Sequence, residues 1–208
     1  MHHHARMVRI REYSCMAHVP ETNPTDNELI AQHRAGDTAA FPALVERYLS
    51  SIFRFVTRLV GDARAAEDLT QETFLKAWLS FSKYKSTFSF KSWLFSIARN
   101  TAIDHLRKRQ HIPFSALDRE DEPAFAEGIV DPLPLPDAQL EQQELGTILT
   151  QTLEQLTPAS RSVVLLHDAE DLTFEDIAQI TKEPMNTVKS RYRRAVLALR
   201  DLLQHVRP

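Results

Sequence analysis

The chain has 208 residues, with 25 Lys and Arg against 28 Asp and Glu, 4 Gly and a single Cys. This length suits one or two small domains. No GxGxxG, GxxxxGKS or GxxxxGKT string occurs, which argues against a nucleotide-binding enzyme fold. The lone Cys15 cannot form an internal disulfide or a CxxC metal site, which argues against a secreted disulfide scaffold and a structural zinc domain. We expect no metal, no cofactor and no catalytic centre. No apolar run approaches the roughly 20 residues that span a bilayer, so we expect a cytoplasmic protein without membrane insertion.

The net charge of -3 conceals a strong segregation of charge along the chain. Residues 83–109 contain seven bases and one acid, for a charge of +6. Residues 110–146 contain nine acids and one base, for -8, and residues 185–200 contain five bases and no acid, for +5. Because affinity for DNA depends on the Lys and Arg that meet phosphates, the two basic segments are candidates for nucleic-acid contact. Each could also be an ordinary solvated face.

The first half of the chain has the apolar spacing of helices. Residues 1–23 show no periodicity and are expected to form a disordered leader. From Asp26 onward, apolar residues recur at spacings of three and four, which predicts a series of helices. Gly36-Asp37 and Gly61-Asp62 separate them, because Gly suits a helix end and Asp suits the cap of the next helix. Pro42 fits the opening turn of the second helix.

The third predicted helix, opened by Asp62, has two contrasting faces. We expect its apolar stripe to consist of Ala66, Leu69, Thr73, Phe74, Ala77, Trp78 and Phe81. The opposite face carries Glu67, Asp68, Gln71, Glu72 and Leu75. Solvent exposure explains the acids, but a leucine among them indicates a docking face.

A loop over Ser82–Ser89 leads into a fourth predicted helix. Cations and aromatic residues alternate in and after it, a composition typical of proteins that bind single-stranded bases. The residues concerned are Lys83, Tyr84, Lys85, Phe88 and Phe90. Phe90 and Trp93 could instead belong to the core. The outer face of the fourth helix carries Ser92, Ser96, Arg99, Asn100, Arg107 and Lys108.

Residues 111–137 lose the helical pattern and are rich in Pro and acids, which predicts a flexible linker. Fully extended, the 26 residues from His111 to Pro136 span up to about 90 Å. Helical periodicity then returns, and no strand-like alternation occurs anywhere. The predicted fold class is therefore all-α, with two small helical domains over 24–110 and 138–208 joined by a flexible, acidic, Pro-rich linker.

Residues 172–203 have the pattern of a helix-turn-helix. Thr173 and Asp176 suit a capped first helix, and Lys182-Glu183-Pro184 breaks the chain before a longer second helix. The buried stripe of that second helix is expected to be Val188, Tyr192, Val196, Leu199 and Leu203. Its outward residues are then Asn186, Thr187, Lys189, Ser190, Arg193 and Arg194. Such residues near the start of a recognition helix meet base edges in the major groove. The alternative is an ordinary helical hairpin with a basic exposed face.

Three strings together resemble the sigma factors of bacterial RNA polymerase, in particular the extracytoplasmic-function class (group 4 of the sigma-70 family). Residues 66–78, AEDLTQETFLKAW, resemble the helix that binds core polymerase. Residues 90–100, FKSWLFSIARN, followed by DHLR at 104–107, resemble the promoter-melting helix. LTFEDIA at 172–178 and TVKSR at 187–191 resemble the C-terminal helix-turn-helix of the class. The motifs stand in the order of the family, whereas Lys182-Glu183-Pro184 replaces a turn that usually contains Gly.

The resemblance implies a role for each surface. The acidic face with Leu75 would dock on the β′ clamp coiled coil, and the β subunit would be a further contact. The 82–89 loop would capture a flipped base of the −10 element, which favours melting because the unpaired base is trapped. The residues implied for the −10 element are Lys83, Lys85, Phe88, Arg99, Asn100, Arg107 and Lys108. Those implied for the −35 element are Lys189, Ser190, Arg193 and Arg194, with Thr187 and Arg191 nearer phosphates. The class further implies an anti-sigma factor as a partner.

Two other functions compete with this interpretation. A free-standing helix-turn-helix regulator would act without polymerase, but it would normally dimerise to read two half-sites, and no heptad repeat is evident. An enzyme with an appended DNA-binding domain would need a catalytic constellation. The adjacent His167 and Asp168 point about 100° apart on a helix and do not form a nucleophile–base pair.

Overall fold

The computed structural model describes residues 23–85, 88–110, 148 and 150–206. The predicted leader, except for Asn23, the linker over 111–137 and the first residues of the C-terminal domain lie outside this part of the chain. Within it every regular element is helical, which confirms the all-α class. None of the described helices is long and apolar enough to cross a membrane.

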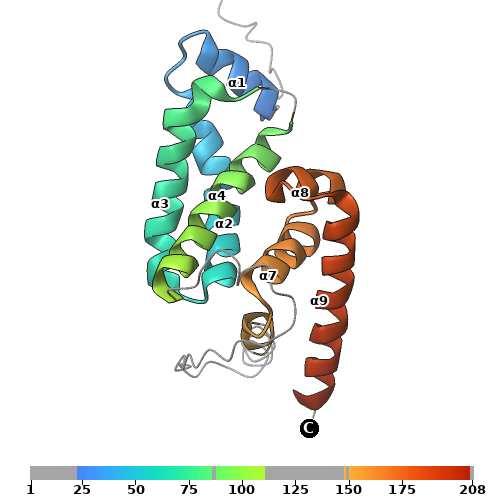
Figure 1. The fold of residues 1–208 in the computed structure, drawn as a ribbon. Coiled ribbons are helices and arrows are strands. Elements are labelled where there is room, and N and C mark those ends of the chain that lie inside the picture. The colour runs from blue at the N-terminus through green and yellow to red at the C-terminus, as the bar shows by residue number, and fades with distance from the viewer. Residues whose placement is uncertain (1–22, 86–87, 111–147, 149, 207–208) are drawn as a thin grey trace, which may run out of the picture.

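Four helices make up the N-terminal domain: α1 (Asp26–Arg34), α2 (Ala40–Val60), α3 (Ala63–Ser80) and α4 (Phe90–Gln110), with a short 3-10 turn over Phe81–Lys83. Helices α2, α3 and α4 pack against one another, and α1 packs on α2 (Figure 1). Gly61 ends α2 with a φ of 73°, a left-handed conformation that glycine adopts without steric cost. Asp62 then caps α3 by accepting hydrogen bonds from the backbone N–H groups of Arg64 and Ala65, as expected from the sequence.

The buried face of α3 is narrower than the predicted stripe. Ala66, Leu69, Thr73 and Ala77 are buried, but the side chain of Trp78 is 48% exposed. Trp78 follows Ala77 by one residue, so it is rotated about 100° from the centre of the buried face. Trp78 therefore lies at the edge of the predicted apolar stripe, partly exposed, and not within the buried face.

The C-terminal domain begins, within the described residues, with a helical stretch at 148 and 150–154. It continues through α7 (Pro158–Val164), a π-helical turn η2 (Leu165–Ala169), α8 (Phe174–Thr181) and α9 (Met185–Val206). Thr173 and Asp176 form the predicted capping box at the start of α8. Helices α8 and α9 pack together as a helix-turn-helix, and α9 also packs on α7 (Figure 1).

The turn between α8 and α9 forms without glycine. Lys182 takes the left-handed conformation, with φ 59° and ψ 35°, and its N–H bonds to the carbonyl of Ala178. The carbonyl of Pro184 then accepts from the N–H groups of Thr187 and Val188 in the first turn of α9. A non-glycine residue in this region costs conformational energy, but the motif keeps its tight turn.

The buried stripe of α9 differs from the predicted one. Among the α9 residues up to 204, whose burial is described, Val188, Arg191 and Ala195 are buried, whereas Val196 and Leu203 are each 38% exposed. An arginine is buried at this position because its guanidinium forms an ion pair with Glu183 of the preceding turn. The family resemblance implied a position near the DNA phosphates for Arg191, whereas the structure buries it.

The two domains are in contact. Helices α7 and α8 pack against α4, and α7 and η2 pack against α2 (Figure 1). The outer face of α4, which the sequence analysis assigned to nucleic acid, is therefore partly covered by the C-terminal domain and partly exposed to solvent.

Candidate nucleic-acid and protein interfaces

The predicted docking residues of α3 all lie on its exposed side. Leu75 is 58% exposed among these acidic and polar neighbours, and Leu79, one turn further, is 70% exposed. We use the name α3 docking surface for Glu67, Asp68, Gln71, Glu72, Leu75, Trp78 and Leu79. The predicted docking face did not include the last two residues, although Leu79 follows Leu75 at the four-residue spacing that places side chains on one face.

The indole ring of Trp78 packs against aromatic rings of α1 and α2. Its ring centroid lies 4.9 Å from that of Phe41 and 5.3 Å from that of His33, and these two rings also contact Phe81. One side of the indole is thus fixed by the core while the other meets solvent. A large aromatic side chain that is partly exposed and pre-positioned is typical of the anchors of protein interfaces.

The aromatic residues around the 82–89 loop divide between core and surface. Tyr84 and Phe90 are each 3% exposed and pack with Phe81 and Trp93, so these two belong to the core. Phe88 is 46% exposed, and its carbonyl accepts a hydrogen bond of 2.7 Å from the hydroxyl of Tyr84. Among the described loop residues, Phe88 is therefore the side chain available for stacking on a base.

The predicted cations of the loop and of α4 differ in exposure. Lys83, Lys85, Asn100 and Lys108 are exposed. Arg107 is half-buried and pairs with Asp104 at 3.3 Å. The loop positions 86 and 87 lie outside the described residues.

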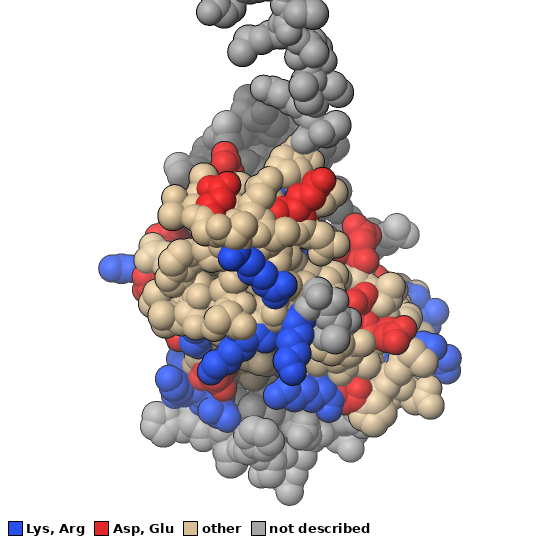
Figure 2. Space-filling model, turned by 90° about the horizontal axis from the view of Figure 1, so that it is seen from above, with Lys and Arg blue, Asp and Glu red and all other residues tan. Residues whose placement is uncertain are grey.

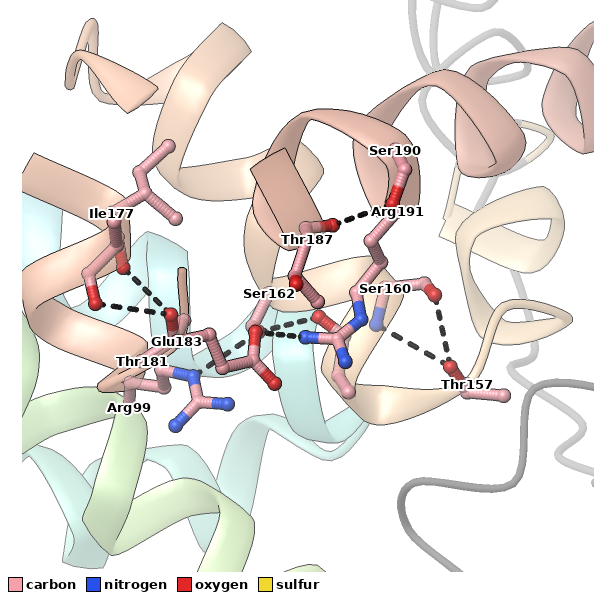
Figure 3. A network of polar contacts seen from close by, with 12 residues as sticks. Arg99, Thr157, Ser160, Ser162, Ile177, Thr181, Glu183, Thr187, Ser190 and Arg191 are labelled. Atoms are coloured by element: carbon pink, nitrogen blue, oxygen red, sulfur yellow. Dashed lines mark hydrogen bonds and ion pairs between the residues drawn. The ribbon is translucent and has the colours of Figure 1, made fainter. Parts of the chain in front are cut away.

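The N-terminal half of the outer face of α4 is partly covered. The expectation that Ser92 points outward was wrong, because its side chain is 2% exposed and donates to Asp176 of α8 at 2.9 Å. Arg99 is half-buried and its Nε donates to Ser162 of α7 at 3.3 Å (Figure 3). A pocket of about 120 Å³ remains between the start of α4 and α8, lined by Phe88, Ser92, Trp93, Ser96, Gln179 and Ile180.

On α9 most of the predicted recognition residues are exposed. Lys189, Ser190, Arg193 and Arg194 lie on the surface, and Lys189 stands 6.0 Å from the ring centroid of Phe174. Thr187 is half-buried and its carbonyl accepts a hydrogen bond from Ser190 (Figure 3). Arg191 is the exception, because only 6% of it is exposed and its guanidinium faces Glu183. In this conformation the buried Arg191 links α9 to the turn before it and does not face solvent.

Charge is distributed unevenly over the surface. Lys and Arg side chains gather in a band on the face seen in Figure 2, where α1, the start of α4 and α8 lie in Figure 1. Acidic side chains stand around this band (Figure 2). The arrangement suits a polyanion on this face, because positive potential concentrates where cations cluster.

Burial and hydrogen bonds shift several pKa values at the contact between the domains. Burial raises the pKa of the Glu170 carboxyl above its ordinary value, although the nearby charge of Lys91 opposes the shift. Burial also acts to raise the pKa of Asp176, but hydrogen bonds from Thr173 and Ser92 outweigh it, so that this pKa is lowered. The Asp176 carboxylate is therefore ionised in its cap.

The described residues contain no cluster of three or more His, Cys, Asp and Glu that could hold a metal ion. His167 and Asp168 have separate partners. The Nδ1 of His167 lies 2.9 Å from the carbonyl of Leu172, and its ring stacks on Phe174. Asp168 accepts a hydrogen bond from the hydroxyl of Tyr192.

These features define an all-helical protein with a C-terminal helix-turn-helix and an N-terminal bundle that exposes an acidic, apolar surface. Residues 44–112 match the family model of sigma-70 region 2, and residues 147–199 match that of sigma-70 region 4. The sigma-H factor of Pseudomonas aeruginosa is 33% identical over 88% of this chain and 96% of its own. The extracytoplasmic-function sigma factor SigE of Mycolicibacterium smegmatis is 34% identical over 88% of this chain and 70% of its own. The chain belongs to the extracytoplasmic-function sigma factors of RNA polymerase.

Solved structures agree with this assignment. The sigma factor RpoE of Bartonella quintana, in complex with the anti-sigma factor NepR, is 27% identical over 80% of this chain and 98% of its own, with a TM-score of 0.59. CnrH, in complex with the cytosolic domain of CnrY, shares the fold at 24% identity over 88% of this chain and 99% of its own, with a TM-score of 0.64. Matches in both domains favour a sigma factor over a free-standing helix-turn-helix regulator.

Proposed function

We propose that the α3 docking surface binds the β′ clamp coiled coil of core RNA polymerase, so that this chain directs the enzyme to its promoters. The observation that carries the proposal is the exposed run Leu75, Trp78 and Leu79 beside acids on one helix face. A regulator that acts without polymerase has no need for such a surface. Contiguous apolar side chains rimmed by polar residues mark protein interaction sites.

Promoter binding is assigned to the remaining surfaces. Phe88 with Lys83 and Lys85 would trap an unpaired base of the −10 element, and the exposed residues of α4 would follow the strand backbone. The start of α9, through Lys189 and its exposed neighbours, would read the −35 element in the major groove. The factor supplies binding energy for melting and no chemical step, so no catalytic role is proposed. It would act in the cytoplasm, where bacterial polymerase works.

An anti-sigma factor is proposed as a further partner. Support comes from the structure of the Bartonella relative, which was solved with such a factor.

The docking assignment is tested with two matched double variants. Glu72→Lys with Leu75→Ala changes two exposed residues of the α3 docking surface three positions apart. Glu46→Lys with Leu49→Ala makes the same changes at the same spacing on exposed positions of α2. We expect the first pair to abolish co-purification with core polymerase and the second to preserve it, with both chains keeping the helical circular dichroism of the unmodified protein. Equal binding by both variants would remove α3 from the interface.

A further inference from the structure

Helix α1 connects two parts of the N-terminal domain. At its start, the carboxylate of Asp26 accepts hydrogen bonds from the guanidinium of Arg47 and the hydroxyl of Tyr48, both in α2. Its last residue, Arg34, contacts the beginning of the 82–89 loop. The match to sigma-70 region 2 starts at residue 44, so α1 lies before the part of the chain that the family model describes. A role for α1 therefore has to be inferred from its contacts.

Arg34 holds the loop where it leaves the short turn over Phe81–Lys83. Its Nη2 donates to the carbonyl of Tyr84 at 2.7 Å, and its guanidinium carbon lies 5.9 Å from the centroid of the Tyr84 ring. A charged donor forms a stronger hydrogen bond than a neutral one, and the face of an aromatic ring attracts a cation. The preceding residue, His33, packs edge-on against Phe81 with ring centroids 4.6 Å apart. The end of α1 thus fixes the first residues of the loop.

Tyr84 in turn holds the backbone of Phe88. Its hydroxyl donates to the Phe88 carbonyl at 2.7 Å. Burial raises the pKa of this hydroxyl, although the charge of Arg34 opposes the shift, so the group keeps its proton and can donate. On the other side of Phe88, the hydroxyl oxygen of Ser89 accepts from the backbone N–H of Ser92 at 3.0 Å, where α4 begins. The backbone of Phe88 is therefore held from both sides, while 46% of the residue is exposed.

A ring that is held in place before binding suits the capture of an unpaired base. If the backbone that carries the ring moved freely, ordering it would cost conformational entropy on binding. A binding side chain that is fixed by supporting hydrogen bonds avoids this cost.

We propose that Arg34 and Tyr84 are positioning residues for base capture, in which α1 fixes Tyr84 and Tyr84 fixes Phe88 ahead of the arrival of the promoter strand. The proposal rests on the proposed function, because Phe88 is the residue that it assigns to the −10 base. It goes beyond that function by making α1 a part of the promoter-binding machinery and by giving the buried Tyr84 a role besides packing.

The support of the loop is tested in the free full-length chain by limited digestion with trypsin. Cleavage after the exposed Lys85 reports opening of the loop, and cleavage after Lys76 in α3 reports unfolding of the domain. Tyr84→Phe removes only the hydroxyl. We expect it to speed cleavage after Lys85 about three- to tenfold, as the loss of one hydrogen bond predicts, and to leave cleavage after Lys76 unchanged.

The matched control is Tyr192→Phe, which removes a hydroxyl that bonds to Asp168 at 2.8 Å in the C-terminal domain. It should leave the cleavage rate after Lys85 unchanged. Equal rates after Lys85 in the unmodified chain and the Tyr84→Phe chain, or a parallel rise after Lys76, would overturn the positioning role.

A second experiment separates positioning from direct contact, because the exposed cation of Arg34 could instead meet a phosphate. Each chain is assembled with core polymerase and titrated with single-stranded −10 DNA from mapped start sites. We expect Arg34→Gln and Tyr84→Phe each to weaken binding about three- to tenfold. In a chain that already carries Phe88→Ala, neither change should weaken binding further, because both act through the position of that ring. Full losses in the Phe88→Ala chain would overturn the proposal.

The same titrations distinguish failure of this proposal from failure of the proposed function. If Phe88→Ala binds the single strand as tightly as the unmodified chain, the assignment of Phe88 to the −10 base is wrong and the positioning role is wrong with it. If Phe88→Ala loses affinity and Tyr84→Phe does not, the positioning role alone is contradicted.

Discussion

The two long faces of the N-terminal domain differ in what they leave open. The α3 docking surface is fully on the outside, with Leu75 and Leu79 more than half exposed. On α4, Lys108 and Arg109 near the C-terminal end are exposed, but Ser92 and Arg99 in its N-terminal half contact the C-terminal domain. The surface assigned to polymerase is thus available in a conformation that hides part of the surface assigned to DNA. This difference favours an order of events in which polymerase is engaged before the promoter strand.

The largest effect, a loss of stability, is expected at Arg161, which is buried at the contact between the two domains. Its buried guanidinium donates to four backbone carbonyls, those of Leu59, Leu153, Glu154 and Leu156. Arg161→Met should lower the free energy of unfolding by about 3 to 5 kcal/mol, because those carbonyls lose their donor inside the protein. Chemical denaturation compared with the exposed Arg193→Met checks this, and equal midpoints for the two variants would contradict it.

The next two substitutions test whether the α3 docking surface and the α4 face bind different partners. Trp78→Ala removes an exposed anchor of the α3 docking surface and should weaken core polymerase binding by about 1 to 3 kcal/mol. Phe88→Ala removes an aromatic ring of similar exposure near α4 and should weaken binding to single-stranded −10 DNA by a similar amount. Fluorescence titrations of both variants with both partners should show reciprocal losses. Parallel losses would mean that the faces do not have separate partners.

A subtler contrast exists within α9. Arg194→Ala should cost roughly 1 to 3 kcal/mol in discrimination at the −35 element, because its side chain is exposed near the start of the recognition helix. Arg191→Ala should instead lower stability, since it breaks a buried ion pair with Glu183. Binding to consensus and substituted duplexes measures the first effect. Equal loss of affinity for every sequence would make Arg194 a phosphate contact.

The smallest effect concerns pH. The pKa of Asp176 is lowered in the folded protein, so its ionised form contributes stability above the unfolded pKa of about 3.8 and this contribution disappears as the pH falls through the folded value. Asp176→Asn should therefore destabilise the chain by about 1 kcal/mol at pH 6 and by less at pH 3. Unfolding midpoints of both chains across this range provide the test. A difference that grows toward low pH would contradict the assignment.

Local signals predicted most of the fold. The caps at Asp62 and Thr173 and the glycine at position 61 act through neighbouring backbone groups, so the helix boundaries they set are visible in the sequence. The exposure of Leu75 was predictable for a related reason, because this leucine interrupts a polar helix face. The partial exposure of Trp78 was not, since a partly exposed aromatic side chain fits an apolar stripe equally well.

The remaining errors of the sequence analysis concern residues whose interaction partner is distant in the sequence or is not indicated by the sequence pattern. Ser92 looked like a surface residue because its partner, Asp176, lies in the other domain. Arg191 was assigned to DNA by the family resemblance, which does not reveal that the carboxylate of Glu183 pairs with it inside the motif. Resemblance to a family identified the motifs, but exposure and pairing of the individual cations depend on the packing of the whole chain.

Reconstituted transcription tests the central claim most directly. The purified chain is added to core polymerase and a pool of promoter fragments, and the 5′ ends of the transcripts are sequenced. The account predicts starts that depend on the chain and share −10 and −35 elements, that are lost with Glu72→Lys and Leu75→Ala and that persist with Glu46→Lys and Leu49→Ala. Starts that do not depend on the chain, or that survive disruption of the α3 docking surface, would contradict it.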